Sequence, residues 1–252
     1  MTQESRQVYP DADALAKAAA VNLLDLAGKA ISERGVFTLA LSGGSTPRKL
    51  YSLLASDPAF GDFPWDKTQL FFGDERHVPP THIDSNYLMV SGTLLASGLV
   101  PANHVHRVRA ELLDADASAV DYDVELHAFF TRAMRLDNFP RFDVILLGMG
   151  PDGHTASLFP GSKGLEEKER WVIANRVEKF KSTRITFTFP ALNAARAVLL
   201  LVAGADKADM LYEVLVTKRD AALYPIQQVR PVDGNKIWLL DRAAAAQLPQ
   251  TV

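Results

Sequence analysis

The chain has 252 residues, of which 48% are hydrophobic and 23% charged, a composition typical of a globular protein with one sizeable core. Its formal net charge of −3 excludes a generally basic surface, so we expect no nucleic-acid or membrane partner, and any affinity for phosphate must be local. The absence of cysteine excludes disulfides, thiolate zinc sites and cysteine nucleophiles.

Residues 1–10 are polar and lack the pattern of a secretory signal, and no later apolar run approaches the roughly 18 residues of a membrane span. We therefore expect a cytoplasmic protein.

Short apolar runs alternate with longer helical patterns along the chain. Strands are predicted at Val36 to Leu41, Gln69 to Phe72, Phe142 to Leu147, Arg184 to Phe189, Ala197 to Val202 and Lys236 to Leu240. Helices are predicted at Asp11 to Glu33, Pro47 to Ala55, Asn86 to Ala96, Ala115 to Leu136, Lys207 to Val216 and Arg242 to Gln247. The alternation predicts an α/β fold: one domain over residues 1–252, with a doubly wound, mostly parallel, Rossmann-like sheet and helices on both faces. Ligands of such sheets bind beyond the carboxyl ends of the strands, so the loops that follow strands are the places to look for chemistry.

The first such loop reads SGGSTP at residues 42–47, between a strand and a helix. Adjacent glycines let the backbone approach an anion, the hydroxyls are donors or helix caps, and the helix N-terminus attracts phosphate. The other interpretation is an ordinary tight turn with a good cap. The candidate phosphate-binding residues are Ser42, Gly43, Gly44, Ser45 and Thr46.

The second loop reads FFGDERHVPP at residues 71–80 and places four ionisable side chains in a row at the end of an aromatic strand. A solvated charge run is the alternative interpretation. Arg76 offers a planar donor fork suited to phosphate or carboxylate, and Asp74 could orient an imidazole or bind sugar hydroxyls. Ser85 and Asn86 then form a plausible cap and polar lining for the next helix.

The third loop reads GMGPDGHTASLFPG at residues 148–161. Its glycines fit the GxGxxG pattern, but Pro160 and Gly161 would end the required helix after about two turns, so we reject a dinucleotide site. The loop instead presents His154, flanked by Gly150 and Gly153, with Asp152 two residues away to set its tautomer. An imidazole is well suited to general-base work near neutral pH, although a structural histidine is the alternative.

The fourth loop, GADKA at residues 204–208, places Lys207 in the first turn of a helix, where a cation is slightly unfavourable unless an anion is bound. An ordinary surface lysine remains the alternative. Arg184, at the head of its strand, is a weaker candidate for the same anion. The remaining histidines do not form a convincing metal site, so we expect no metal and no other cofactor.

Together, these four segments resemble the 6-phosphogluconolactonase family, in the glucosamine/galactosamine-6-phosphate isomerase superfamily, in order and spacing over nearly the whole chain. The resemblance implies a NagB/RpiA-like fold and hydrolysis of 6-phospho-D-glucono-1,5-lactone to 6-phospho-D-gluconate in the oxidative branch of the pentose phosphate pathway. It also implies that Gly43, Gly44, Ser45 and Thr46 form the phosphate-binding loop, that Lys207 neutralises the phosphate, that His154 is the base, and that Asp74 and Arg76 line the pocket.

Two other functions remain open. An aldose–ketose isomerase or deaminase acting on an amino-sugar 6-phosphate would share this architecture, but such enzymes carry a glutamate shortly after the histidine, and residues 155–161 hold no acidic side chain. A non-catalytic sugar-phosphate sensor would need an effector domain, for which no segment is spare. The expected partner is a phosphorylated sugar lactone, and the expected state is a monomer or small homo-oligomer. Which aspartate orients His154, and whether Arg76 serves the phosphate or the developing oxyanion, stay undecided.

Overall fold

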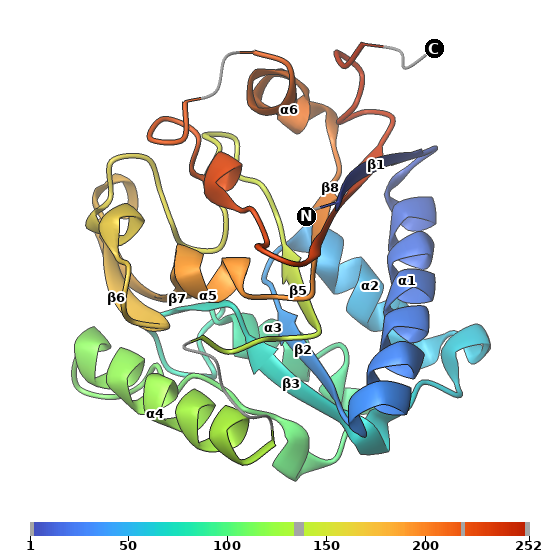
Figure 1. The fold of residues 1–252 in the computed structure, drawn as a ribbon, viewed down its shortest axis with the longest axis vertical. Coiled ribbons are helices and arrows are strands. Elements are labelled where there is room, and N and C mark those ends of the chain that lie inside the picture. The colour runs from blue at the N-terminus through green and yellow to red at the C-terminus, as the bar shows by residue number, and fades with distance from the viewer. Residues whose placement is uncertain (1–2, 134–138, 218–219, 250–252) are drawn as a thin grey trace.

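A parallel sheet forms the centre of the molecule (Figure 1). The computed structural model describes residues 3–133, 139–217 and 220–249. Within them, six parallel strands pair in the order β1-β9-β8-β5-β2-β3. Their bounds are β1 Gln3–Tyr9, β2 Phe37–Leu41, β3 Thr68–Phe72, β5 Val144–Leu147, β8 Ala197–Val202 and β9 Asn235–Asp241. Every residue of β2, β5 and β8 is buried, which explains their continuous apolar sequences.

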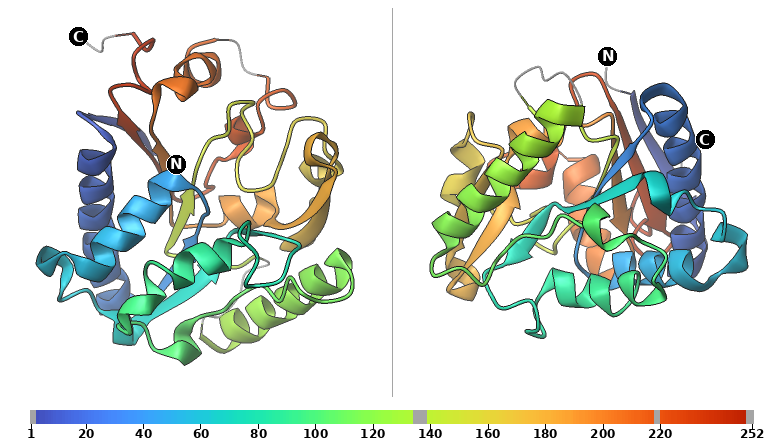
Figure 2. Two further views of the ribbon diagram at one scale, coloured as in Figure 1. Left: turned by 180° about the vertical axis from the view of Figure 1, so that it is seen from behind. Right: turned by 90° about the horizontal axis from the view of Figure 1, so that it is seen from below.

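Helices cover both faces of this sheet, as the alternating pattern predicts (Figure 2). Helix α1 (Ala12–Arg34) begins where Asp11 accepts hydrogen bonds from the backbone of the first turn, and it ends at Gly35. It packs against the sheet and against α2 (Ser45–Ser56). Helix α4 (Ala115–Ala133) lies on the opposite side. The shorter helices are α3 (Asn86–Ser91), α5 (Phe189–Asn193) and α6 (Ala208–Leu215).

A second, antiparallel sheet was not predicted. In the described residues it has the strand order β4-β7-β6, with bounds β4 Asp74–Arg76, β7 Ser182–Phe187 and β6 Val172–Val177, and α4 packs on it. The strand predicted at Arg184 to Phe189 therefore belongs to this sheet, and part of the second loop is the strand β4. The strand β1 was missed because its half-polar sequence carries no continuous apolar run, and β6 because its short apolar run at residues 171–174 is broken by Asn175 and Arg176.

Two predicted helices are wrong in part or whole. Residues 242–247 form turns: the Asp241 carboxylate accepts the Ala244 N–H as a helix cap would, but Pro249, which has no backbone N–H to donate, follows within about two turns. The helix that begins at Asn86 ends at Ser91, where Gly92 is its C-cap, and a separate 3₁₀ turn covers Leu95–Ser97. The end predicted for α4, at Leu136, lies outside the described residues.

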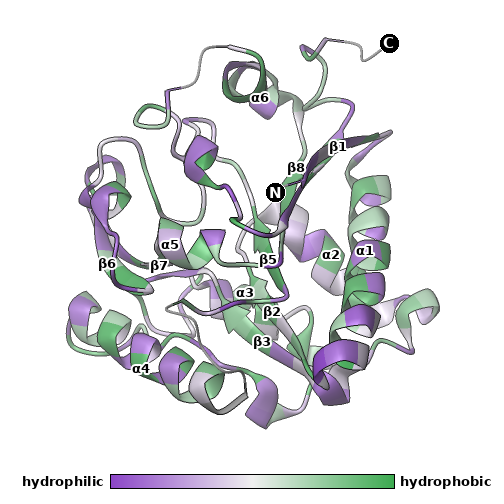
Figure 3. Cartoon of the chain, in the orientation of Figure 1, coloured by the Kyte–Doolittle hydropathy of each residue, from purple (hydrophilic) through white to green (hydrophobic). Residues whose placement is uncertain are grey.

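The core consists of apolar side chains from both faces of the main sheet, and the central strands are drawn as hydrophobic in Figure 3. Aromatic side chains from β3 and α4 meet there: Phe71 contacts Phe130 and Phe142 at ring-centroid distances of 5.9 and 5.2 Å. None of the described helices combines the length and the apolar character needed to cross a membrane. The rigid sheet that results holds the loops at its carboxyl edge.

Candidate active site

A cavity of about 330 Å³ lies where the loops after β2, β5 and β8 meet the start of β4 and of α3. All four segments identified in the sequence contribute to its wall. Of the candidate residues, those that line it are Ser42, Gly43, Gly44, Ser45, Thr46, Asp74, Arg76, Asn86, Gly150, His154 and Lys207. Asp152, Gly153 and Arg184 lie outside this lining. Asp152 nevertheless contacts His154, and Arg184 lies opposite Arg76 in the register of the antiparallel sheet.

The turn after β2 opens the N-terminus of α2 toward the cavity. Gly44 is the N-cap, no side chain caps the helix, and Ser45 is its first residue rather than a cap. The hydroxyl of the buried Tyr51 accepts a hydrogen bond from the Ser42 N–H at 3.0 Å and donates one to the Ser42 carbonyl at 2.9 Å, which fixes the turn. Among the described residues, the buried hydroxyl oxygen of Ser42 has no hydrogen-bond partner. These donors suit an anion.

Glycine is required at position 43 because the Asn86 side chain lies against its backbone. A Cβ at Gly43 would stand 2.0 Å from Asn86 Oδ1. The Asn86 amide donates to the backbone carbonyl of Asp74 at 2.9 Å, and the Asp74 carboxylate accepts a hydrogen bond of 2.6 Å from the Ser157 hydroxyl. Asp74 is 8% exposed, so its carboxylate is held in one position at the cavity wall.

The neighbours of Asp74 on β4 have separate roles. Glu75, which the sequence did not single out, is buried and accepts hydrogen bonds from the N–H groups of Asn86 and Tyr87 at 2.7 and 2.8 Å, so it holds the start of α3. Burial raises the pKa of Glu75, and these backbone bonds oppose the rise. Arg76 donates to the Asp84 carbonyl through Nη1, whereas its buried Nε has no partner among the described residues. That Nε is a free donor for an anionic oxygen.

Arg184 stands beside Arg76 in the register of β7 with β4. Burial, and then the charge of Arg76, lower the pKa of Arg184. Its guanidinium carbon lies 5.4 Å from the ring centre of Phe180. Arg184 therefore adds positive potential behind Arg76 and does not itself line the cavity.

The imidazole of His154 is fixed on three sides. Its Nδ1 hydrogen-bonds the Asp152 carboxylate, its ring stacks on Phe159 at 3.9 Å, and a Cβ at Gly150 would stand 2.0 Å from the ring, so only glycine fits there. An ionised carboxylate accepts but cannot donate, so Nδ1 carries the proton and Nε2 is the basic nitrogen. Burial lowers the pKa of His154, although Asp152 opposes the shift, so the imidazole is neutral at pH 7.

Asp152 is the aspartate that orients His154, which answers a question the sequence left open. Burial acts to raise its pKa, but hydrogen bonds from Lys179 at 2.8 Å and from His154 outweigh burial and lower the pKa to about 2. The loop follows turns without a helix, as expected from Pro160 and Gly161. It is braced internally, because Gly150 N–H donates to the His154 carbonyl at 2.9 Å and the Thr155 hydroxyl to the Gly148 carbonyl at 2.8 Å.

The turn after β8 brings Lys207 into the same cavity. The Asp241 carboxylate, at the end of β9, accepts the Gly204 N–H at 3.0 Å and holds this turn. The ammonium of Lys207 forms an ion pair of 2.8 Å with Asp206, whose side chain is 70% exposed and also lines the cavity. An anion that binds here competes with an exposed carboxylate, which water already solvates.

Several supporting residues were not predicted from the sequence. Ser157 and Phe159 lie in the GMGPDGHTASLFPG segment, whose composition was the available signal. Three other residues hold the turns of the site through contacts with segments elsewhere in the sequence: Tyr51, Glu75 and Asp241. No local sequence pattern marks them.

Comparison with known proteins supplies a family. Residues 10–238 match the family described as glucosamine-6-phosphate isomerases/6-phosphogluconolactonase. A 6-phosphogluconolactonase of Nostoc sp. is 42% identical, over 96% of this chain and 97% of that protein. The structure of 6-phosphogluconolactonase from Trypanosoma cruzi is similar with a TM-score of 0.86 and 29% identity, covering 98% of each chain.

A monomeric glucosamine-6-phosphate deaminase also has a similar structure, with a TM-score of 0.78 over 97% of this chain and 99% of that one. At 16% identity, this likeness concerns the fold alone.

Proposed function

The chain belongs to the glucosamine-6-phosphate isomerase and 6-phosphogluconolactonase family, and from that premise we infer that it hydrolyses 6-phospho-D-glucono-1,5-lactone to 6-phospho-D-gluconate in the pentose phosphate pathway. One observation supports this activity most directly: a single cavity contains the Ser42 hydroxyl and Arg76 Nε, which have no partner among the described residues, and an imidazole that Asp152 orients and whose pKa burial lowers. The first set of groups suits the phosphate and the second suits activation of water.

We assign phosphate binding to the residues 42–46 turn and Lys207. The N-terminal N–H groups of α2, the Ser42 hydroxyl and the Lys207 ammonium supply donors and positive charge, and Lys207 exchanges Asp206 for the phosphate. Binding at this end leaves the lactone ring to extend across the cavity toward His154.

We assign the base to His154. Its Nε2 removes a proton from water while the water oxygen forms a bond to the lactone carbonyl carbon, and the carbonyl electrons move onto oxygen. When this oxyanion collapses, the bond from the carbonyl carbon to the ring oxygen breaks, and the imidazolium returns its proton to that leaving oxygen. Asp152 holds the ring and stabilises the transient imidazolium.

Arg76 offers a further donor at the cavity wall, since its buried Nε has no partner among the described residues. The N–H groups of Gly150, Gly153 and His154 already donate within the third loop, which leaves Nε of Arg76 to meet an anionic oxygen of the substrate. To identify that oxygen, Arg76→Gln is compared on the phosphorylated and unphosphorylated lactones. Equal losses on both place Arg76 at the ring carbonyl, whereas a loss confined to the phosphorylated substrate places it at the phosphate.

The test of the function itself is a hydrolysis assay on 6-phosphogluconolactone and on gluconolactone, corrected for spontaneous opening. We expect turnover of 6-phosphogluconolactone and a much lower kcat/KM for gluconolactone, because gluconolactone has no phosphate for the residues 42–46 turn and Lys207, the phosphate cradle, to bind. Incubation with glucosamine 6-phosphate tests the isomerase alternative, and release of ammonia without lactone turnover would overturn our assignment.

The proposal requires one partner, the phosphorylated sugar lactone. We place the reaction in the cytoplasm and expect a monomer or small homo-oligomer, to be measured by light scattering on the eluting protein.

A further inference from the structure

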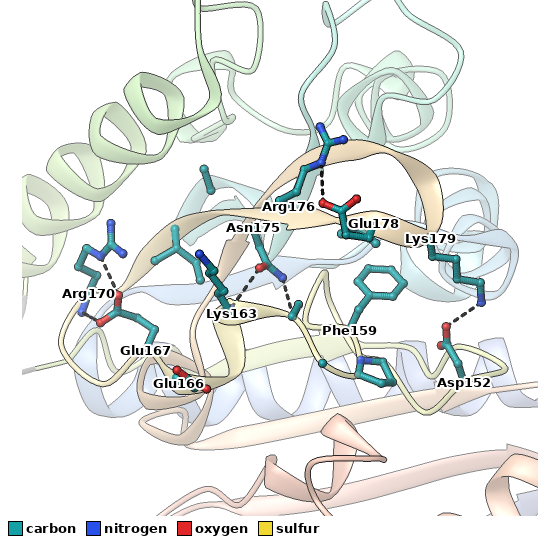
Figure 4. Close-up of a pocket in the computed structure, with 17 residues that line it drawn as sticks. Asp152, Phe159, Lys163, Glu166, Glu167, Arg170, Asn175, Arg176, Glu178 and Lys179 are labelled. Carbon is teal, nitrogen blue, oxygen red and sulfur yellow. Dashed lines mark hydrogen bonds and ion pairs between the residues drawn. The ribbon is translucent and has the colours of Figure 1, made fainter.

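A second hollow, an open groove of about 950 Å³, lies next to the third loop, residues 148–161 (Figure 4). Asp152 and Phe159 line this groove, and both also contact His154, which lines the other cavity. Two side chains therefore separate the groove from the proposed base. Whatever holds Asp152 and Phe159 from the groove side also holds the imidazole.

The tip of the β6–β7 hairpin supplies both of these holding contacts. Nζ of Lys179 lies 2.8 Å from Oδ2 of Asp152, on the carboxylate oxygen that His154 does not use. The ring of Phe180 meets Phe159 edge to face, with 5.7 Å between centroids and an interplanar angle of 80°. Adjacent residues of one turn thus contact the two groups that flank His154 (Figure 4 shows the Lys179 contact).

We propose that Lys179 and Phe180 are positioning residues for His154, Lys179 through Asp152 and Phe180 through Phe159. The inference rests on the proposed function, in which His154 is the base. Lys179 binds Oδ2 of Asp152, so that Oδ1 of the same carboxylate remains directed at Nδ1 of His154. Phe180 fixes the ring of Phe159, on which the imidazole stacks.

The charge of Lys179 has a second effect on the base. The charged groups that act on His154 are Asp152 in its own loop, Asp74 on β4 and Lys179. The two carboxylates favour the imidazolium, and the Lys179 ammonium opposes it and helps to lower the pKa of His154. Nearby Arg176 and Glu178 pair with each other at 3.2 Å and leave the Lys179–Asp152 pair undisturbed.

The test is Lys179→Met, with Lys163→Met as the matched control, since Lys163 is an exposed lysine lining the same groove that forms no contact with Asp152 in the structure. We expect K179M to lower kcat about two- to fivefold, the range an exposed ion pair supports, with KM unchanged. The acid limb of the pH–rate profile of K179M should move to higher pH, because loss of the ammonium raises the pKa of His154. K179R should restore both kcat and the position of the acid limb, and K163M should match the wild type in both.

Phe180→Ala separates packing from charge. We expect it to lower kcat about two- to tenfold, since it removes the contact with Phe159 and the ring over which the Lys179 and Arg184 cations lie at 5.6 and 5.4 Å. The acid limb of the pH–rate profile should move less than in K179M, because no charge is removed. Phe180→Leu should recover part of kcat.

A K179M profile that overlays that of K163M would overturn the role of Lys179, and an F180A enzyme with wild-type kcat would overturn that of Phe180. His154→Ala is measured alongside: if it keeps its kcat, the assignment of the base fails, whatever the hairpin variants do. Because Lys179 and Phe180 are exposed, we expect their variants to keep the fold, which circular dichroism of each variant checks.

Discussion

The imidazole of His154 lies between a carboxylate and an aromatic ring, and these neighbours act on it in opposite senses. Burial, to which Phe159 contributes, disfavours the charged ring, while Asp152 favours it. For the base that we propose, the outcome is an imidazole whose pKa lies below its ordinary value and that has a nearby anion to stabilise an imidazolium. The chemistry of the site therefore depends on a balance between two contacts of one side chain.

His154→Ala is expected to lower kcat about 10²- to 10⁴-fold with little change in KM, because it removes proton transfer and leaves the phosphate cradle intact. Initial rates across substrate concentrations measure the two constants. His127→Ala, on α4 and outside the cavity, is the control for loss of an imidazole. A His154→Ala enzyme with a raised KM and an unchanged kcat would contradict the role of base.

Wild-type kcat should fall on the acid side with a midpoint below the ordinary imidazole pKa, since burial lowers the pKa of His154. Asp152→Asn removes the carboxylate that opposes this shift, so the midpoint should move to still lower pH. The value of kcat at the high-pH plateau of the Asp152→Asn enzyme should be about 10- to 100-fold lower than that of the wild type, as loss of a charge-assisted hydrogen bond predicts. A pH–rate profile of each enzyme tests this, and an Asp152→Asn midpoint above that of the wild type would refute it.

Single residues were predictable where chemistry was concentrated in one loop. Asp152 and His154 are two positions apart, so spacing made their contact a candidate, but it did not decide which aspartate orients the imidazole. The hydrogen bond of Ser157 to Asp74 joins residues 83 positions apart, and no property of a serine in a loop reveals such a partner.

At the scale of elements, the anion binding that we propose depends on where helices begin. Helix α2 starts without a side-chain cap, and so does α6, whose N-cap is Lys207 itself. The cavity thus meets the positive ends of two helices, one following β2 and the other β8. These starts were predictable from glycine turns after apolar strands. The strand β4 was not, because its acidic and basic side chains are buried by α3 and β7, which lie elsewhere in the sequence.

Lys207→Ala is expected to raise KM for the phosphorylated lactone about tenfold to a hundredfold and to leave kcat/KM for gluconolactone unchanged, because the lysine acts on the phosphate alone. Lys49→Ala, on the exposed side of α2, is the matched control. Equal losses on the two substrates would place Lys207 at the reacting carbonyl instead.

At the scale of the whole molecule, the site exists because parallel strands end at one edge. The residues 42–47, 74–76, 148–154 and 203–207 are distant in sequence, and the order of the main sheet brings three of these loops together. The parallel class and this edge were predictable from alternating elements. The antiparallel sheet that supports β4 was not, since the pairing of β4 with β7 joins segments more than 100 residues apart, and only β6 and β7 form a local hairpin.

Binding of the product should stabilise the whole fold through this cavity. At 6-phosphogluconate concentrations about 100 times Kd, linkage predicts about 2.7 kcal/mol, or a rise of about 5 to 10 °C in Tm for a chain of this size. Thermal scans with and without ligand measure the rise, with gluconate at equal ionic strength as the control. Lys207→Ala should show a smaller rise, and an equal rise with gluconate would contradict a phosphate cradle.

The position of β9 between β1 and β8 has a consequence for biosynthesis. β1 can pair with β9 only after residues 235–241 have left the ribosome, so it stays without this partner while residues 10–234 are translated. Its sequence, QESRQVY, is polar enough to remain solvated during that delay, which limits aggregation of the incomplete protein.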